Sequence, residues 1–186
     1  MIRWAATHSG LVSDLARHES VLEVGTGTGM LSGFVSRFSR LTVSLDNNLS
    51  VIRTARSFTD GVGAHVAMIQ GDAFALPFPD RSFGSAFSQG LLEHFSDADI
   101  VRLIEEQLRV ASVAYASVPG LFYPHVWRFG PGLVGNERFM GIGRWRRILG
   151  AFQVDGSYYP DFKIATLAGV TVPWPAHILL KVSRCE

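Results

Sequence analysis

The amino-acid sequence predicts an α/β protein with a mainly parallel sheet and helices on both of its faces. Short apolar runs alternate with stretches of helical periodicity through the first 118 residues, the order that results when helices connect parallel strands. The first apolar run, residues 21–24, stops at a glycine-rich turn, residues 25–29, and a helical pattern follows at once. Ligands of such sheets bind beyond the carboxyl ends of the strands. We therefore expect a site where this turn and the later strand ends meet.

The composition indicates one globular domain. The chain has 186 residues, of which 47% are hydrophobic and 18% charged, and this length suits a single domain with its own core. The one cysteine, Cys185, excludes an internal disulfide framework and a multi-cysteine zinc site. We therefore expect residues 1–186 to form one domain, with no metal site and in a reducing, cytoplasmic location.

Charge and hydropathy narrow the classes of partner. The net charge is +1, and the modest basic excess of residues 119–186 is poor support for nucleic-acid binding, which needs clustered cations. No apolar run comes near the roughly 20 residues that cross a bilayer, and residues 1–17 lack the apolar core of a secretory leader. We predict no nucleic-acid partner and no membrane insertion; oligomeric state is not predicted.

Two predicted helices flank the glycine turn. The first covers residues 4–17 and turns one face to the core. The residues on that face are His8, Leu11, Val12 and Leu15. The second follows the turn, and four apolar residues at helical spacing predict its buried face. These are Leu31, Phe34, Val35 and Phe38. We expect His8 to be a packing residue rather than a ligand.

The glycine turn carries a recognisable pattern. Its glycines are spaced two residues apart, and the main chain can approach a ligand closely there, because glycine has no Cβ. With an acidic residue ahead of it, the segment reads E-x-G-x-G-x-G. It resembles the first motif of class I S-adenosylmethionine (SAM)-dependent methyltransferases, in which this turn wraps the amino-acid end of SAM. The resemblance assigns five residues to the cofactor: Glu23, Gly25, Thr26, Gly27 and Gly29.

Two alternatives remain for this turn. The nicotinamide and flavin fingerprint G-x-G-x-x-G/A needs a small third residue, and Met30 stands at that position here. The other alternative is a structural tight turn that binds no ligand.

A second strand, predicted over residues 41–45, ends in a polar triplet, 46–48. A carboxylate at this point of a βαβ unit can accept hydrogen bonds from both hydroxyls of a ribose, and Asp46 lies seventeen residues beyond the last turn glycine, close to the usual interval of about 20. Capping of the next helix is the alternative role, for which Asn48 is the better residue. We therefore assign Asp46 and Asn47 to the cofactor site.

The segment 71–83 reads G-D-A-x-x-L-P-F-P-D-x-S-F. It resembles the corresponding stretch of the small-molecule, type 11-like branch of class I methyltransferases. The resemblance implies that Asp72 binds the exocyclic amine of adenine and that the backbone beside it, at Ala73, contacts a ring nitrogen. Phe74 or Leu76 is then placed to cover the ring. The alternative is that the prolines only end a strand and shape a surface loop.

The end of the fourth predicted strand, residues 83–89, bears on the substrate. Methyltransferases that act on amines of DNA bases or on protein glutamine carry an acidic-or-Asn, Pro, Pro, aromatic tetrapeptide there. This chain has residues 88–91, Ser-Gln-Gly-Leu, in its place, which disfavours those substrates. We assign Gln89 to the cofactor site.

The residues after that strand, 91–95, resemble the L-E-H signature that lines the space between methyl donor and acceptor. An acceptor that loses a proton needs a base. Glu93 or His94 could take it, and His94 is the better candidate by its ordinary pKa. The alternative is that His94 only positions or packs against its neighbours.

The remaining elements complete the sheet. We predict a strand over 66–70, a helix from residue 96, a fifth strand over 113–118 and a last helix from residue 144. The usual Lys-Pro-Gly-Gly turn before the fifth strand is missing. Strands over 154–159 and 178–182 match the antiparallel pair that closes the sheet in the family, with Pro-Trp-Pro interrupting between them. Residues 119–143 are irregular and predict a lid or substrate loop, the alternative being a mobile flap that packs on nothing in particular. Its candidate pocket residues are Tyr123, His125, Trp127, Arg128 and Phe129.

Together these segments predict a Rossmann-like SAM-dependent methyltransferase that acts on a small-molecule acceptor. Four strand ends converge on one cleft, which would hold SAM and align the acceptor for in-line displacement. Two other functions remain open. One is a catalytically silent SAM-binding subunit that regulates a partner, and the other is a nicotinamide oxidoreductase.

Overall fold

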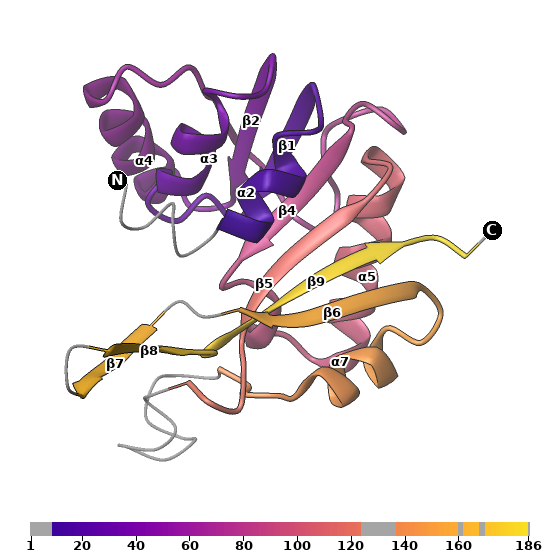
Figure 1. Ribbon diagram of the computed structural model, residues 1–186. Helices are drawn as coiled ribbons and strands as arrows, with labels where there is room; N and C mark the ends of the chain where they lie inside the picture. The colour runs from indigo at the N-terminus through magenta and orange to yellow at the C-terminus, as the bar shows by residue number, and fades with distance from the viewer. Residues whose placement is uncertain (1–8, 124–136, 160–161, 168–169, 186) are drawn as a thin grey trace.

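Seven strands form one mixed sheet in the order β3-β2-β1-β4-β5-β9-β6 (Figure 1). The computed structural model describes residues 9–123, 137–159, 162–167 and 170–185. The five parallel strands are β1 Ser20–Val24, β2 Leu41–Asp46, β3 Ala67–Gln70, β4 Ser85–Gln89 and β5 Ala114–Pro119. Strand β9, His177–Ser183, runs antiparallel to both β5 and β6, Gln153–Tyr159. The predicted fold class and its antiparallel C-terminal pair are confirmed.

Helices cover both faces of the sheet, as predicted (Figure 1). One face carries α2 Ser9–Leu15, α3 Met30–Val35 and α4 Leu49–Gly61, and the other carries α5 Asp97–Val110 and α7 Ile142–Ile148. The two layers of core follow from the alternation of side chains along each strand. Tyr115 packs with Leu11 and Leu31 on the first face, whereas its neighbour Ala116 packs with Leu103 and Trp145 on the second.

The helix after the glycine turn is shorter than its apolar spacing predicts. It ends at Val35, and Phe38 lies beyond it with 55% of its surface exposed, so the prediction that Phe38 is buried was wrong. The hydroxyls of Ser36 and Ser39 donate to the carbonyls of Gly33 and Val35. Serine side chains that bond to the backbone in this way compete with helix continuation, which accounts for the early end.

A two-stranded unit, β7 Phe162–Leu167 with β8 Val170–Trp174, lies between β6 and β9 in the sequence. The sequence predicted only an interruption there, because of its prolines. Pro173 instead pairs with Lys163 inside this unit, which is compatible with proline because both strands of an isolated pair are edges.

The structure covers part of two other predictions. Of the N-terminal helix predicted over residues 4–17, α2 is the described part, with Leu11 and Leu15 buried, and His8 lies outside the described residues. Most of the predicted lid, 119–143, lies outside them too, although Pro119 ends β5 and α7 begins at Ile142.

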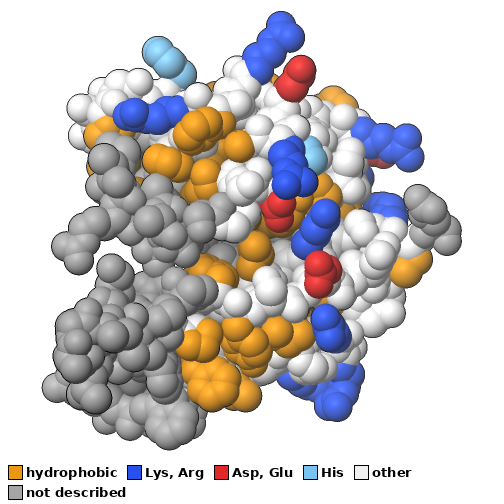
Figure 2. Space-filling view, in the orientation of Figure 1, with side chains coloured by type: hydrophobic (Ala, Val, Ile, Leu, Met, Phe, Trp, Pro, Cys, Tyr) orange, Lys and Arg blue, Asp and Glu red, His pale blue; other side chains and the backbone are white. Residues whose placement is uncertain are grey.

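The surface of the described residues gives two further observations. On the face shown in Figure 2, Lys and Arg side chains stand singly or in small groups, with acidic side chains among them. Within the part of the chain that the structure describes, no helix combines the length and apolar character needed to span a membrane.

Candidate active site

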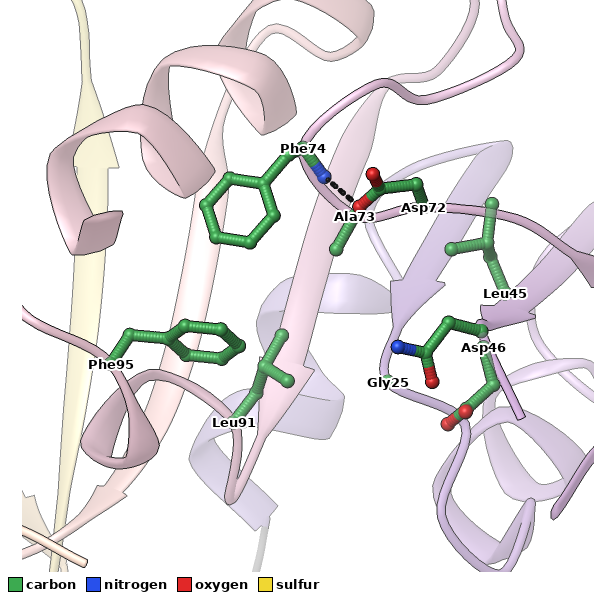
Figure 3. Close-up of a pocket in the computed structure, with 9 residues that line it drawn as sticks. Gly25, Leu45, Asp46, Asp72, Ala73, Phe74, Leu91 and Phe95 are labelled. Atoms are coloured by element: carbon green, nitrogen blue, oxygen red, sulfur yellow. Dashed lines mark hydrogen bonds between the residues drawn. The ribbon is translucent and has the colours of Figure 1, made fainter. Parts of the chain in front are cut away.

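A hollow of about 120 Å³ lies beyond the carboxyl ends of β1, β2 and β3 (Figure 3). We call it the Gly25 hollow. Its lining residues are Gly25, Leu45, Asp46, Asn47, Asp72, Ala73, Phe74, Leu91 and Phe95. Parallel pairing brings these strand ends to one edge of the sheet, since β1 pairs with β2 and β2 with β3 in register. Five of the predicted cofactor residues are thereby brought together: Gly25, Asp46, Asn47, Asp72 and Ala73.

The three turn glycines serve different purposes. All have positive φ, +85° at Gly25, +52° at Gly27 and +70° at Gly29, a region that L side chains rarely adopt. Only Gly25 lines the hollow. A Cβ on Gly29 would lie 2.9 Å from the Cβ of Ala55 on α4, so this glycine lets the start of α3 pack closely on α4. A Cβ on Gly27 would meet nothing within 4 Å among the described residues.

Glu23 and Thr26 lie beneath the turn rather than in the hollow. The Glu23 side chain is only 3% exposed, and its Oε2 accepts a hydrogen bond of 2.8 Å from the Ser44 hydroxyl. Thr26 Oγ1 lies 2.9 Å from the same hydroxyl. Burial raises the pKa of Glu23 to about 7, against the opposing effect of hydrogen bonds from Ser32 and Ser44. The structure therefore gives Glu23 a position from which it supports the turn.

Asp46 stands at the end of β2, on the rim of the hollow (Figure 3). Its Oδ1 accepts the backbone N–H of Asn48 at 2.9 Å, and the Asn48 side chain caps α4 through the N–H of Ser50. The prediction that Asn48 caps the helix is confirmed. Within the described residues, Oδ2 of Asp46 has no hydrogen-bond partner, so a carboxylate oxygen is available beside the glycine turn.

Asp72 shapes the turn that follows β3. Its Oδ1 accepts the N–H of Phe74 at 2.9 Å, and its carbonyl accepts the N–H of Ala75 at 3.1 Å. This turn directs the Phe74 ring into the hollow, where it meets the Phe95 ring edge-on at 5.5 Å between centroids (Figure 3). Leu76, the other residue predicted to cover a ring, is buried in the core instead.

A guanidinium fixes the segment after this turn. Arg109, on α5, donates to the carbonyls of Leu76 and Phe78, both at 2.9 Å, and to the carboxylates of Asp80 and Glu106, each at 2.8 Å. Glu106 in turn accepts the N–H of Leu76 at 2.7 Å. The hydrogen bond from Arg109 lowers the pKa of Glu106. Two residues of one helix thus bind the backbone of a loop with no regular structure of its own.

Three further lining residues, Leu45, Leu91 and Phe95, were not assigned to the cofactor from the sequence. Leu91 and Phe95 belong to the stretch that resembles the L-E-H signature, so a position near the site was expected for them. The sequence did not predict that they line the Gly25 hollow. For Leu45, the available signal in the sequence is its position directly before Asp46 at the end of β2. The described residues include no group of three or more side chains arranged to hold a metal ion.

Comparison with known proteins agrees with this geometry. Residues 21–112 match the methyltransferase domain family, and that range includes every strand end that lines the Gly25 hollow. These 92 residues are just under half of the chain, and the match supports a class I SAM-dependent methyltransferase.

One sequence relative and two solved structures show how far the similarity reaches. A ubiquinone/menaquinone biosynthesis C-methyltransferase from Hahella chejuensis is 34% identical over 99 residues, which are 49% of this chain and 38% of that relative. The chain thus spans well under two thirds of that protein's length.

The two structures show the fold. A chain in the complex of the Haloferax volcanii Trm112 methyltransferase activator with a putative methyltransferase has a TM-score of 0.73 at 18% identity, over 99% of this chain and 91% of that one. The magnesium protoporphyrin IX methyltransferase from Synechocystis PCC 6803, with bound SAH, has a TM-score of 0.69 at 14% identity, over 98% and 86%.

A second hollow, of about 180 Å³, lies beside the first. We call it the Glu93 hollow. Its lining residues are Gly90, Glu93, His94, Pro119, Tyr123, Glu137 and His177. The short helix η1, Leu92–His94, begins this wall, and both candidate proton acceptors, Glu93 and His94, lie on it. Gln89, predicted to contact the cofactor, ends β4 and is not among the described lining residues of either hollow.

Four of the predicted pocket residues of the lid, His125, Trp127, Arg128 and Phe129, lie outside the described residues. The fifth, Tyr123, lines the Glu93 hollow. Sequence reasoning did not find Glu137 or His177, because the fold brings them to this hollow from distant parts of the chain.

Proposed function

We propose that this protein transfers the methyl group of SAM to a small-molecule acceptor, with SAM in the Gly25 hollow and the acceptor next to it. The observation that carries the proposal is the convergence of Gly25, Asp46 and Asp72, from three successive strand ends, on one hollow. The whole protein's activity is inferred, since the sequence match reaches only 38% of the named relative.

The lining residues suit the parts of SAM in their chemistry. Gly25 has no side chain where its Cβ would stand 3.3 Å from Leu91, so the main chain is open to the amino-acid end of the ligand. Asp46 presents a carboxylate suited to ribose hydroxyls. Asp72 and the backbone of Ala73 present an acceptor beside a donor, the pattern that matches the edge of adenine. The rings of Phe74 and Phe95 supply an apolar surface for the base.

The residues of the chain act mainly by positioning and by excluding water. SAM, when bound, supplies an activated methyl group on a sulfonium, so the protein needs to align the acceptor in line with the bond that breaks. Leu91 and Phe95 cover the side of the hollow that faces η1. An acceptor that loses a proton would meet Glu93 or His94, the two candidate bases of the Glu93 hollow.

The small-molecule acceptor is supported by two observations. The tetrapeptide found in methyltransferases of DNA-base amines or protein glutamine is replaced by residues 88–91, Ser-Gln-Gly-Leu. The Hahella protein is named for ubiquinone and menaquinone biosynthesis and the Synechocystis protein for magnesium protoporphyrin IX, and we carry over from them only that the acceptor is a metabolite.

Calorimetry with S-adenosylhomocysteine and with NAD tests the cofactor. We expect the thioether to bind and NAD not to bind. Binding of NAD without binding of the thioether would instead support a nicotinamide oxidoreductase. Incubation of a metabolite extract with labelled SAM then tests catalysis. Transfer of label to a metabolite supports the proposal, whereas binding of the thioether with no labelled product would favour a silent SAM-binding subunit.

A further inference from the structure

We propose that the Glu93 hollow binds the methyl acceptor and selects amines, holding the acceptor nitrogen between the carboxyl groups of Glu93 and Glu137. The inference rests on the proposed methyl transfer and names the chemical class of its acceptor. It is carried by a buried carboxyl group with an unused oxygen, by the charge of the lining, by an aromatic wall and by the position of the hollow.

Glu93 is a buried acid that its own fold leaves incompletely paired. The residue is 3% exposed, and among the described residues Oε2 has no hydrogen-bond partner. Leaving such a group buried and unpaired is costly, and it is usual for a ligand or water to complete it. Because Glu93 lines the hollow, its carboxyl group belongs to the wall that a bound ligand would meet.

The described lining has acidic groups and no Lys or Arg. Glu93 and Glu137 both line the hollow, with the imidazoles of His94 and His177 as the other titratable side chains besides Tyr123. The nearest cation in sequence, Arg138, is directed to Asp97, which it meets at 2.7 Å. A ligand that brings a positive charge or hydrogen-bond donors therefore complements this hollow, and an anionic ligand does not.

An aromatic wall completes the fit to an amine. The ring of Tyr123 meets that of His177 edge-on, with 5.1 Å between the ring centroids. The ring of Tyr159 stacks on that of His177, with 5.8 Å between the centroids. The Tyr159 hydroxyl is 2.5 Å from the Ser117 hydroxyl on β5, which fixes this ring. Aromatic faces stabilise ammonium groups through their negative quadrupole.

The position of the hollow is suited to receive a methyl group. Residues 90–95 contribute to both hollows. Leu91 and Phe95 line the Gly25 hollow, whereas Gly90, Glu93 and His94 line the other. Gly90 has φ +64°, which gives the chain its sharp bend at the end of β4. Ligands in the two hollows would thus both contact this one turn of chain, on which the two hollows adjoin.

The chemical step balances with these groups alone. The bound ammonium gives a proton to the carboxylate of Glu93, which frees the nitrogen lone pair. The nitrogen then forms a bond to the methyl carbon as the carbon–sulfur bond breaks, and the bonding pair goes to sulfur. Burial, followed by repulsion from Glu137, raises the pKa of Glu93 to about 7, which suits proton exchange with an amine near neutral pH.

Benzylamine and benzyl alcohol serve as matched probes, because they share a ring and differ in charge. We expect chemical-shift titration to show benzylammonium binding at least tenfold more tightly than the alcohol, with shifts at Gly90 and Tyr123. The variant Glu93→Gln should lose about tenfold in affinity, Glu137→Gln several-fold, and Glu105→Gln, an exposed residue of α5, nothing. Wild-type affinity should rise from about pH 6 to about pH 8 as Glu93 ionises, and this rise should vanish in Glu93→Gln.

Equal binding of the two probes, or no loss in both Glu93→Gln and Glu137→Gln, would overturn the inference. If Glu93→Gln does not fold, Glu137→Gln decides alone, because that side chain is partly exposed. Calorimetry with S-adenosylhomocysteine on the same samples separates the two proposals. Thioether binding without a preference for the amine removes only the acceptor class, whereas a preference for the amine without thioether binding removes the methyl transfer and the acceptor role with it.

Discussion

The hydroxyl of Ser44 on β2 donates a 2.8 Å hydrogen bond to the carboxyl group of Glu23 on β1, 21 residues away in the sequence. Both residues are buried, and Thr26 of the glycine turn lies 2.9 Å from the same hydroxyl. This contact ties the turn to the neighbouring strand from below. Glu23 therefore acts on the Gly25 hollow through the turn that it supports.

The first prediction concerns Glu23→Gln and the pH dependence of stability. The pKa of Glu23 is about 7 in the folded protein and near 4.5 when unperturbed. The folded state thus holds the proton more tightly between these values, and the free energy of unfolding falls as pH rises through them, by about 3 kcal/mol for this group. In Glu23→Gln, the free energy of unfolding should fall less between these pH values, because the amide does not ionise. Urea unfolding at about pH 5 and about pH 8 measures it.

Glu93 contributes to the same pH dependence of stability, because its pKa is also raised to about 7. We expect each of Glu23→Gln and Glu93→Gln to remove part of the pH dependence and the double variant to remove most of it. Glu105→Gln, exposed on α5, should leave the slope unchanged. An unaltered slope in Glu23→Gln would mean that the buried carboxyl ionises normally.

The second prediction compares Gly29→Ala with Gly27→Ala. Both positions have positive φ, so each variant should lose about 1 kcal/mol to backbone strain. At Gly29 the new Cβ would also stand 2.9 Å from the Ala55 Cβ and 3.2 Å from its backbone, so α3 and α4 must separate. We expect Gly29→Ala to lose roughly 2 kcal/mol more than Gly27→Ala in urea unfolding. Equal losses would show that the helices move apart at no cost.

Much of the Gly25 hollow was predictable because its signals are local. A glycine turn, a carboxylate after a strand and an Asp beside a turn each reveal themselves over a few residues. Parallel strands then bring Gly25, Asp46 and Asp72 to one edge without further information. The depth of Glu23 was not predictable, since it depends on Ser44 in the neighbouring strand.

The Glu93 hollow was less predictable because its residues come from four distant parts of the chain. Glu93 and Tyr123 lie on opposite sides of β5 in the sequence, and His177 joins them only when β9 pairs with β5. No periodicity or spacing encodes such a meeting. The shortening of α3 at Val35 was missed for a different reason, because apolar spacing outweighed the serines in the prediction.

The third prediction concerns the two carboxylates of the Gly25 hollow. In Asp46→Asn and Asp72→Asn, the amide oxygen can still accept the N–H of Asn48 or Phe74, so the local turns should persist. A lost charged hydrogen bond to the ligand weakens binding by about 1.5–3 kcal/mol. We therefore expect S-adenosylhomocysteine to bind roughly tenfold to a hundredfold more weakly to each variant, by calorimetry.

Asp60→Asn, an exposed change on α4, is the control for that experiment and should bind the thioether like the wild type. Full affinity in Asp46→Asn would remove the ribose contact from the proposed site. Full affinity in Asp72→Asn would remove the contact with adenine.

The last prediction concerns Arg109, which holds the segment after Asp72 through two carbonyls and two carboxylates. Lysine keeps the charge but has one nitrogen, so Arg109→Lys cannot bind all four partners at once. We expect the free energy of unfolding to fall by about 1–2 kcal/mol and the amides of Leu76 and Phe78 to exchange faster. Hydrogen exchange resolved by residue measures this directly.

The same variant links stability to the site. Ala73 and Phe74 line the Gly25 hollow immediately ahead of the segment that Arg109 holds, and Arg109 itself does not line it. Loosening that segment should therefore weaken the binding of S-adenosylhomocysteine several-fold. Arg53→Lys, on the exposed side of α4, should change neither exchange nor affinity. Faster exchange with unchanged affinity would show that the Phe74 turn is held by Asp72 alone, through its bond to the Phe74 N–H.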